Sequence, residues 1–150
     1  MKIREADKND CVKLDALLTK LIQYEVQFDK NLSPVYVVEN NYNERLDWPG
    51  HKAYVAEEDD DIVGFVYGFA FEVPGIYVEP IAIADALYVE EKYRNRGIAT
   101  ELLRKFIDFA AEQGACRVEL KVMSKNTKAM RIYEGLGFSE SKKYMTLGLK

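Results

Sequence analysis

The fold is indicated most clearly by residues 86–103, ALYVEEKYRNRGIATELL. Its apolar start predicts the end of a strand, and a helix is predicted from Ile98, so a polar loop joins the two. The first turn of a helix leaves backbone N–H groups unpaired, and its dipole favours an anion there. Gly97 lets a ligand approach the backbone, while Arg94 and Arg96 can bind phosphate oxygens. The stretch predicts a phosphate-binding loop, with a solvated basic loop that caps the helix as the alternative.

Regular periodicities extend in both directions from this loop. Downstream, apolar residues recur every three or four positions and predict a helix over about 98–113, with Gly114 suited to its end. These residues are Ile98, Leu102, Phe106, Phe109 and Ala110. Upstream, residues 81–89 alternate as a strand does, and Asp85 shares the parity of the apolar side chains. The loop therefore connects a strand to an amphipathic helix.

The first eighty residues predict a strand, two helices and a hairpin. Residues 2–6 form the strand, followed by a helix to about residue 28 and a shorter helix over about 35–46. Residues 53–57 and 62–71 form the hairpin around a polar turn. The longer helix carries an apolar stripe that is expected to pack in the core: Val12, Leu14, Leu17, Leu18, Leu21, Ile22 and Val26.

The end of the chain returns to strands and one short helix. A strand is predicted over 116–123, a helix over about 126–136 and a last strand over 143–149. No repeat, linker or low-complexity segment interrupts this order. At 150 residues, the chain is expected to form a single domain over residues 1–150.

Composition narrows the class of protein. Hydrophobic residues make up 48% and charged residues 31%, and no apolar run is long enough for a membrane span. The net charge of -4 opposes nucleic-acid binding, because phosphate contacts need clustered Lys and Arg. The N-terminus has no apolar signal core, so a cytoplasmic location is expected. Cys11 and Cys116 are expected to be small buried hydrophobes, and the single His51 argues against a metal site.

Two motifs follow one another in the second half of the chain. The first is residues 94–99, RNRGIA, and the second is residues 126–138, NTKAMRIYEGLGF. The first resembles the acetyl-coenzyme A motif of the GNAT acetyltransferase superfamily, and the second is similar to that family's Asn, Ala, Tyr and Gly-Phe signature. The resemblance is close over residues 81–140, whereas the first eighty residues follow only the family's order of elements. It implies a mixed α/β fold with a mostly antiparallel sheet flanked by helices and strands splayed at the cofactor site.

The resemblance also implies acetyl-coenzyme A as cosubstrate, without a metal. Acetyl transfer from a thioester to an amine needs a proton for the departing thiolate, which a phenol with a pKa of about 10 can supply. The family's general acid maps onto Tyr133, and Asn126 lies about two helical turns earlier on the same face. Alone, Tyr133 could be a core aromatic and Asn126 an N-cap. The implied cofactor-binding residues are Leu87, Tyr88, Val89, Arg94, Asn95, Arg96, Gly97, Ile98, Ala99, Thr100, Asn126, Ala129 and Tyr133.

The general base is predicted to be Asp85. An acid on the apolar face of a strand would be desolvated, which would raise its pKa towards a useful value. A strand bulge could instead turn the side chain outward. The commonest acidic site of this strand in the family falls on Ala84, so Glu72, Glu79 and a water chain compete for the role.

The predicted function is transfer of an acetyl group from acetyl-coenzyme A to a primary amine of a small molecule or peptide. The alternatives are a noncatalytic coenzyme A sensor or interaction module on the same fold and a structural domain, but the presence of Tyr133 favours an enzyme. No nucleic-acid or membrane partner is expected, and a homodimer is left open. Acceptor determinants are expected within residues 26–51 and 71–80. A pocket for a cationic amine would be lined by Tyr36, Glu39, Tyr42, Glu44, Trp48, Phe71 and Glu72, for which solvated helix faces and core aromatics are the alternative.

Overall fold

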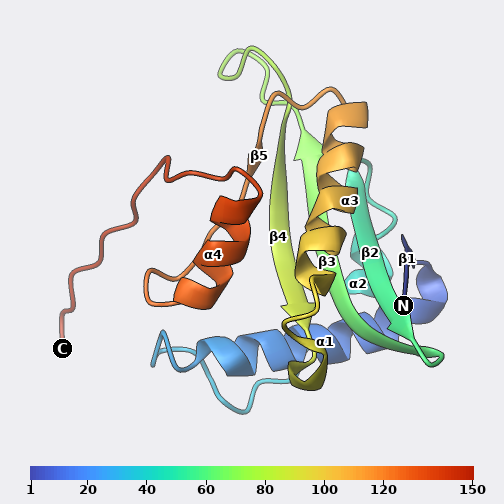
Figure 1. Ribbon diagram of the computed structural model, residues 1–150. Coiled ribbons are helices and arrows are strands. Elements are labelled where there is room, and N and C mark those ends of the chain that lie inside the picture. Colours follow the sequence, from blue (N-terminus) through green and yellow to red (C-terminus); the bar gives the residue numbers. More distant parts are fainter.

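One five-stranded sheet, in the order β1-β2-β3-β4-β5, organises the computed structural model, which describes residues 1–150 (Figure 1). The strands are β1 (Lys2–Glu5), β2 (His51–Glu58), β3 (Asp61–Phe71), β4 (Ile81–Val89) and β5 (Val118–Glu119). The first four pair antiparallel with their neighbours, and β5 is parallel to β4. The predicted mixed fold with a mostly antiparallel sheet is confirmed.

Helices cover both faces of the sheet. The α-helices are α1 (Cys11–Glu25), α2 (Tyr42–Arg45), α3 (Ile98–Glu112) and α4 (Thr127–Gly135), and the 3-10 helices are η1 (Lys8–Asp10) and η2 (Glu91–Tyr93). In Figure 1, α3 crosses the near face, α1 lies across the far face, and α4 stands apart beyond β5. No helix combines the length and apolar character needed to cross a membrane.

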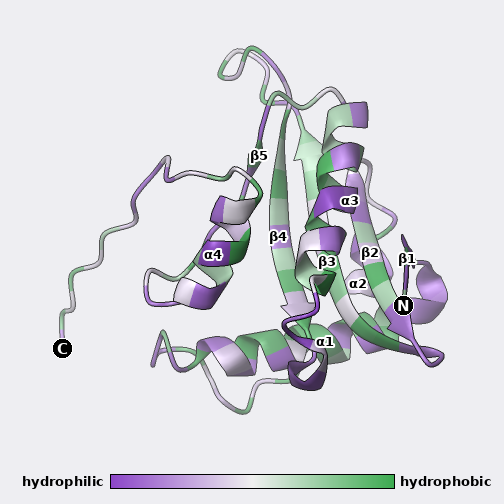
Figure 2. Cartoon of the chain, viewed as in Figure 1, coloured by the Kyte–Doolittle hydropathy of each residue, from purple (hydrophilic) through white to green (hydrophobic).

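The strand periodicity divides the core into two clusters. On β3, Phe65 and Tyr67 pack with Leu14 on the α1 side, whereas Val66 packs with Phe106 on the α3 side. This is the period of two that a pleated strand imposes. Figure 2 shows the central strands as largely hydrophobic and the outward surfaces of the helices as hydrophilic. Burial of both faces fixes the register of the strands that carry the site.

The N-terminal strand is tied to the first helix by a partly buried ion pair. The Arg4 guanidinium donates to both carboxylate oxygens of Asp10, at 2.8 and 2.9 Å. The backbone N–H of Asp7 donates to the same carboxylate at 2.8 Å, completing a capping box. The guanidinium beside Asp10 holds the pKa of that carboxyl below its usual range.

The segment between α1 and β2 contains less helix than the predicted 35–46, because only α2 is helical. The backbone N–H of Val38 donates to Thr19 Oγ1 at 3.0 Å, and that of Tyr42 donates to the Asp15 carboxylate at 3.2 Å. These hydrogen bonds attach the segment to α1 and replace helical ones. A helix over the whole range was wrong because tertiary partners compete for its N–H groups.

Two of the predicted strands also differ from those in the structure. The strand expected over 143–149 is wrong, since residues 139–150 form no regular structure. The strand expected over 116–123 is paired only at Val118–Glu119. A strand exists only where a neighbouring chain accepts its hydrogen bonds, and this side of the sheet offers few.

Two residues that were expected to be buried, Val12 and Cys116, are exposed. Val12 is 84% exposed, because it lies on the side of α1 opposite the fully buried Leu14. Cys11 is buried as predicted, but Cys116 is exposed just before β5. The helix predicted to residue 28 ends at Glu25.

Candidate active site

β4 and β5 separate soon after they meet. Their pairing covers only Ala82 with Val118 and Ile83 with Glu119. From Ala84 to the end of β4, the edge facing β5 therefore has no strand partner. Figure 1 shows the resulting gap between the ribbons on the side of β4 that faces α4. The residues predicted to bind the cofactor arm, Leu87, Tyr88 and Val89, lie on this unpaired stretch.

The loop from β4 to α3 exposes unpaired donors. The first helical hydrogen bond of α3 runs from Glu101 N to Gly97 O, so the N–H groups of Ile98, Ala99 and Thr100 precede it. Gly97 has φ 78° and ψ 8°, and a Cβ there would meet no atom within 4 Å. The space at the helix N-terminus is open. This geometry suits a phosphate, as the sequence motif indicated.

The two arginines of the loop differ in their contacts. Arg94 Nε donates to Val89 O at 2.8 Å, and its guanidinium lies 5.0 Å from the ring centroid of Tyr24 and 5.3 Å from that of Tyr88. Arg94 therefore fixes the loop to the end of β4. Arg96 is 54% exposed and lies 3.6 Å from the Glu58 carboxylate. Asn95 between them adopts φ 63°, a left-handed conformation that turns the chain into the helix.

The second motif forms the start and face of α4. Asn126 is the N-cap, and its Oδ1 accepts a hydrogen bond from Ala129 N at 3.3 Å. The N-cap interpretation of Asn126 is thus confirmed as a structural contact. Its amide nitrogen makes no hydrogen bond within the chain, so this donor is free for a ligand.

Tyr133 lies seven residues further on, half-buried against the core cluster that includes Ala84 and Val89 of β4. Its ring packs edge-on against Phe138 with centroids 6.1 Å apart. Burial, together with the negative charge of Glu25, raises the pKa of Tyr133 to about 12. The phenol is therefore protonated at neutral pH, and its hydroxyl has no hydrogen-bond partner in the protein. A group in this state can donate a proton to a ligand.

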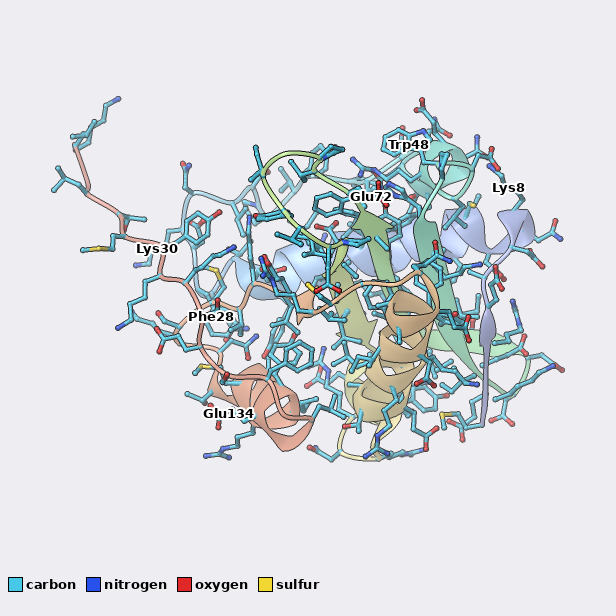
Figure 3. All side chains as sticks on the ribbon, turned by 90° about the horizontal axis from the view of Figure 1, so that it is seen from above. Lys8, Phe28, Lys30, Trp48, Glu72 and Glu134 are labelled. Atoms are coloured by element: carbon cyan, nitrogen blue, oxygen red, sulfur yellow. The ribbon has the colours of Figure 1, made fainter.

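Glu25 is a residue that the sequence reasoning missed. Its carboxylate ends α1, is partly buried and forms no hydrogen bond or ion pair, and burial raises its pKa. Figure 3 shows Phe28, just beyond α1, on the same side of the molecule as Glu134 of α4. The available signal was an acid placed four residues after Leu21, in line with the apolar stripe of the helix.

Asp85 sits at a β-bulge. Tyr67 pairs with Ala86 and Gly68 with Ala84, so Asp85 is the extra residue. The side chain is exposed, and the expected burial on the apolar face is wrong; the bulge alternative is confirmed. Gly68 lets the backbones of β3 and β4 approach closely at this bulge, because a Cβ there would lie 2.2 Å from Ile83 O.

The other acids proposed for the base lie away from the core. Glu72 and Glu79 are both exposed in the segment between β3 and β4. Ala84, the position at which the resemblance implied an acid, is buried in the α3-side cluster. Asp85 is the one acidic residue within β4, and its side chain is exposed.

A cluster of aromatic side chains lies on β2, β3 and the α2 segment: Trp48, His51, Tyr67 and Phe69. His51 Nδ1 lies 2.5 Å from the Tyr67 hydroxyl. The His51 ring stacks on the Phe69 ring with centroids 4.9 Å apart, and it packs edge-on against the Trp48 ring with centroids 5.2 Å apart. Burial lowers the pKa of His51, and the nearby Asp85 charge opposes that shift. The Asp85 charge thus acts on two residues of this aromatic cluster, His51 and Tyr67.

A hollow of about 390 Å³ opens beside this cluster, between α1 and the α2 segment. It is lined by Leu18, Ile22, Tyr36, Val38, Glu39, Asn40, Asn41, Glu44, Arg45 and Trp48. Four of the predicted acceptor residues, Tyr36, Glu39, Glu44 and Trp48, are brought together here. The structure places three others elsewhere: Tyr42 is buried at 1% exposure, and Phe71 and Glu72 lie outside the lining.

Comparison with known proteins identifies the family. Residues 17–138 match the model of the Acetyltransferase (GNAT) family. The chain is 28% identical over 148 residues to thialysine N-epsilon-acetyltransferase of Bos taurus, covering 90% of this chain and 82% of that protein. It is 30% identical over 88 residues to N-acetyltransferase 8 of Homo sapiens, which spans 59% of this chain and 38% of that protein.

Solved structures agree in fold. A mutant of the BH1408 protein from Bacillus halodurans superposes with a TM-score of 0.85 at 20% identity, over the full length of both chains. The aminoglycoside N-acetyltransferase AAC(6')-Iy in complex with CoA superposes with a TM-score of 0.74 at 18% identity, covering 99% of each chain. With the family model matching most of the sequence, the chain belongs to the GNAT family of N-acetyltransferases.

Proposed function

We propose that the protein transfers the acetyl group of acetyl-coenzyme A to a primary amine of a small molecule, with Tyr133 as general acid. The observation that carries this proposal is the unpaired edge of β4, which leads from the open loop at Gly97 towards the core face against which Tyr133 packs. An extended ligand lying along this edge would have its phosphates at the loop and its thioester near the phenol.

The cosubstrate is held mainly by backbone groups. The N–H groups of Ile98, Ala99 and Thr100 bind the pyrophosphate, aided by the helix dipole and by the exposed Arg96. Arg94 acts through its bond to Val89 O and keeps the loop in place. The free amide nitrogen of Asn126 donates to the pantetheine arm.

The transfer itself needs two proton movements. The amine nitrogen forms a bond to the acetyl carbon, the C–S bond breaks, and Tyr133 gives its proton to the departing thiolate. An amine that enters as a cation first releases one proton to solvent, which frees its lone pair. After the attack the nitrogen loses a second proton to Asp85, directly or through water, and that proton restores the phenol. The net reaction of the neutral amine moves one proton from the amine to the thiol.

The acceptor enters from the hollow beside α2. Glu39 and Glu44 supply two negative charges against the one positive charge of Arg45, whose guanidinium lies 5.2 Å from the Trp48 ring centroid, so the hollow has a net negative charge that suits a small cationic amine. The Bos taurus relative is named for acetylation of thialysine, which supports an amine acceptor. A cytoplasmic location and a single domain stay predictions.

A free-thiol assay with a panel of amines tests the proposal. Diamino acids, polyamines, aminoglycosides and peptide N-termini are compared with acetyl-coenzyme A as donor. Thiol release that depends on a primary amine and falls in Glu39→Gln with Glu44→Gln supports it. Binding of acetyl-coenzyme A without acetylation of any class would overturn it in favour of a noncatalytic module.

A further inference from the structure

Arg45 is a half-buried cation without a carboxylate partner. Three other arginines, Arg4, Arg96 and Arg117, each lie within 3.6 Å of a carboxylate. Arg45 forms no ion pair, although it is partly withdrawn from solvent and borders the hollow beside α2. Withdrawing a charge from water is costly unless a group of opposite charge meets it. The environment of Arg45 therefore favours an anion that the protein itself does not supply.

The protein holds this guanidinium in a fixed position. Arg45 Nε donates to Asn41 Oδ1 at 2.9 Å, and the guanidinium carbon lies 5.2 Å from the ring centroid of Trp48. A hydrogen bond with the Tyr67 hydroxyl raises the pKa of Arg45. His51 Nδ1 lies 2.5 Å from the same hydroxyl and so fixes it in turn. A group that is already immobilised loses little further entropy when it binds a ligand.

Several donors around Arg45 remain available to a ligand. Asn41 takes the N–H of Nε, which leaves the N–H groups of the terminal nitrogens largely without partners in the protein. The side-chain amide nitrogen of Asn41 also makes no hydrogen bond within the chain, and both residues line the hollow. A guanidinium can offer two parallel N–H groups to one carboxylate. These donors fit a carboxylate bound inside the hollow.

The charges around the hollow match an amino acid that carries a second amine. Glu39 and Glu44 are two acids beside one cation, Arg45. A basic amino acid such as ornithine or lysine has the opposite set, two ammonium groups and one carboxylate. A polyamine has no carboxylate, so it would place only positive charge beside the guanidinium. The charge of Asp85 also acts on Arg45, so an amine that shares a molecule with the bound carboxylate can extend towards the proposed base.

We propose that Arg45 binds the carboxylate of the acetyl acceptor, and that this acceptor is a basic amino acid with a free carboxylate group. The inference rests on the acetyl transfer proposed above. One ammonium group of the acceptor lies against Glu39 and Glu44, and the reacting amine extends towards Asp85. Arg45 contributes to the binding and selection of the acceptor and takes no part in proton transfer.

The fluorescence of Trp48 tests this site without turnover. Trp48 is the only tryptophan of the chain, and its ring lies against Arg45. Ornithine and lysine are titrated into the full chain in the presence of coenzyme A, each beside its carboxamide, which lacks only the negative charge. We expect a saturable change with dissociation constants at least about tenfold lower for the acids. Equal affinities for acids and amides, or no binding of either acid, would overturn the proposal.

Substitution of Arg45 separates a binding role from a structural one. In Arg45→Gln the acids should lose their advantage while the affinity for the amides stays unchanged, and Arg45→Lys should restore part of the preference. Arg104→Gln is the matched control, because Arg104 is exposed on α3 and also forms no ion pair; the preference should persist there. If Arg45→Gln weakens acids and amides equally, Arg45 only supports the fold of the hollow and the proposal fails.

Thiol release distinguishes failure of this inference from failure of the proposed function. Acetylation of the amides as fast as of the acids, with acetyl-coenzyme A as donor, would keep the acetyl transfer and overturn the role of Arg45. Binding of the acids through Arg45 without any thiol release would instead support the carboxylate site and overturn the proposed transfer.

Discussion

Replacing Tyr133 by Phe tests the proposed chemistry most directly. The substitution removes one hydroxyl that has no hydrogen-bond partner and keeps the ring contact with Phe138. The free energy of unfolding should therefore change by less than about 0.5 kcal/mol, since no buried polar group loses a partner. Any large loss of activity is then attributable to the missing proton donor.

The expected loss follows from general acid catalysis. Such catalysis contributes about a hundred- to ten-thousand-fold, so Tyr133→Phe should lose roughly 3–5 kcal/mol of transition-state stabilisation. Turnover is measured by thiol release at saturating amine, and acetyl-coenzyme A affinity by calorimetry. Turnover should fall while affinity stays similar. The loss should shrink with a thioester whose leaving thiol is more acidic, because that sulfur needs the proton less.

Tyr54→Phe is the matched control. Tyr54 is also partly buried, and burial raises its pKa, but it lies on β2 away from the proposed site. Loss of the Tyr54 hydroxyl should leave the turnover number unchanged. An unchanged turnover number in Tyr133→Phe, with chemistry rate-limiting, would refute the reasoning and return Tyr133 to a core aromatic.

The same phenol gives a pH test. Because folding raises the pKa of Tyr133 from its ordinary value of 10.0 to about 12, the unfolded chain releases the phenol proton first, so this residue is neutral for stability below pH 10.0 and lowers stability as pH rises from 10.0 towards 12. Urea unfolding should thus show a steeper alkaline loss in wild type than in Tyr133→Phe. Identical alkaline slopes would show that the phenol ionises as readily folded as unfolded.

Three further perturbations follow from the site and the core. Gly97→Trp should weaken acetyl-coenzyme A binding at least about tenfold by calorimetry, whereas Gly114→Trp, with the same positive φ at the other end of α3, should not; equal affinities would exclude the loop. Asp85→Asn should lower turnover at least about a hundredfold, and a turnover that stays near wild type in Asp85→Asn but falls in Glu25→Gln would transfer the role of base to Glu25. Asp10→Asn should cost roughly 2 kcal/mol of unfolding free energy at neutral pH, and because the pKa of Asp10 is lowered, the difference should vanish as pH falls below its usual range; a pH-independent difference would show that the ion pair contributes nothing.

Local sequence determined the elements that depend on neighbours in the chain. The strand over residues 81–89 was predicted with its observed bounds, and α3 begins at Ile98 as its apolar period required. Gly97 indicated the loop because glycine lets a ligand approach the backbone, and its φ of 78° in the structure is a conformation that favours glycine. These features depend on the alternation of apolar and polar residues, on the helical periodicity and on the local backbone conformation, all of which consecutive residues determine.

Tertiary structure decided what those elements face. Asp85 is exposed because the register between β3 and β4 shifts between Tyr67 and Gly68, and no local pattern in β4 shows this. Arg94 turns to Val89 because the β4 end lies beside it, and Glu25 comes near Tyr133 only when α1 crosses the sheet. The tail stays unpaired although its composition is that of a strand, since hydrogen bonds between strands need a partner that the local sequence cannot supply.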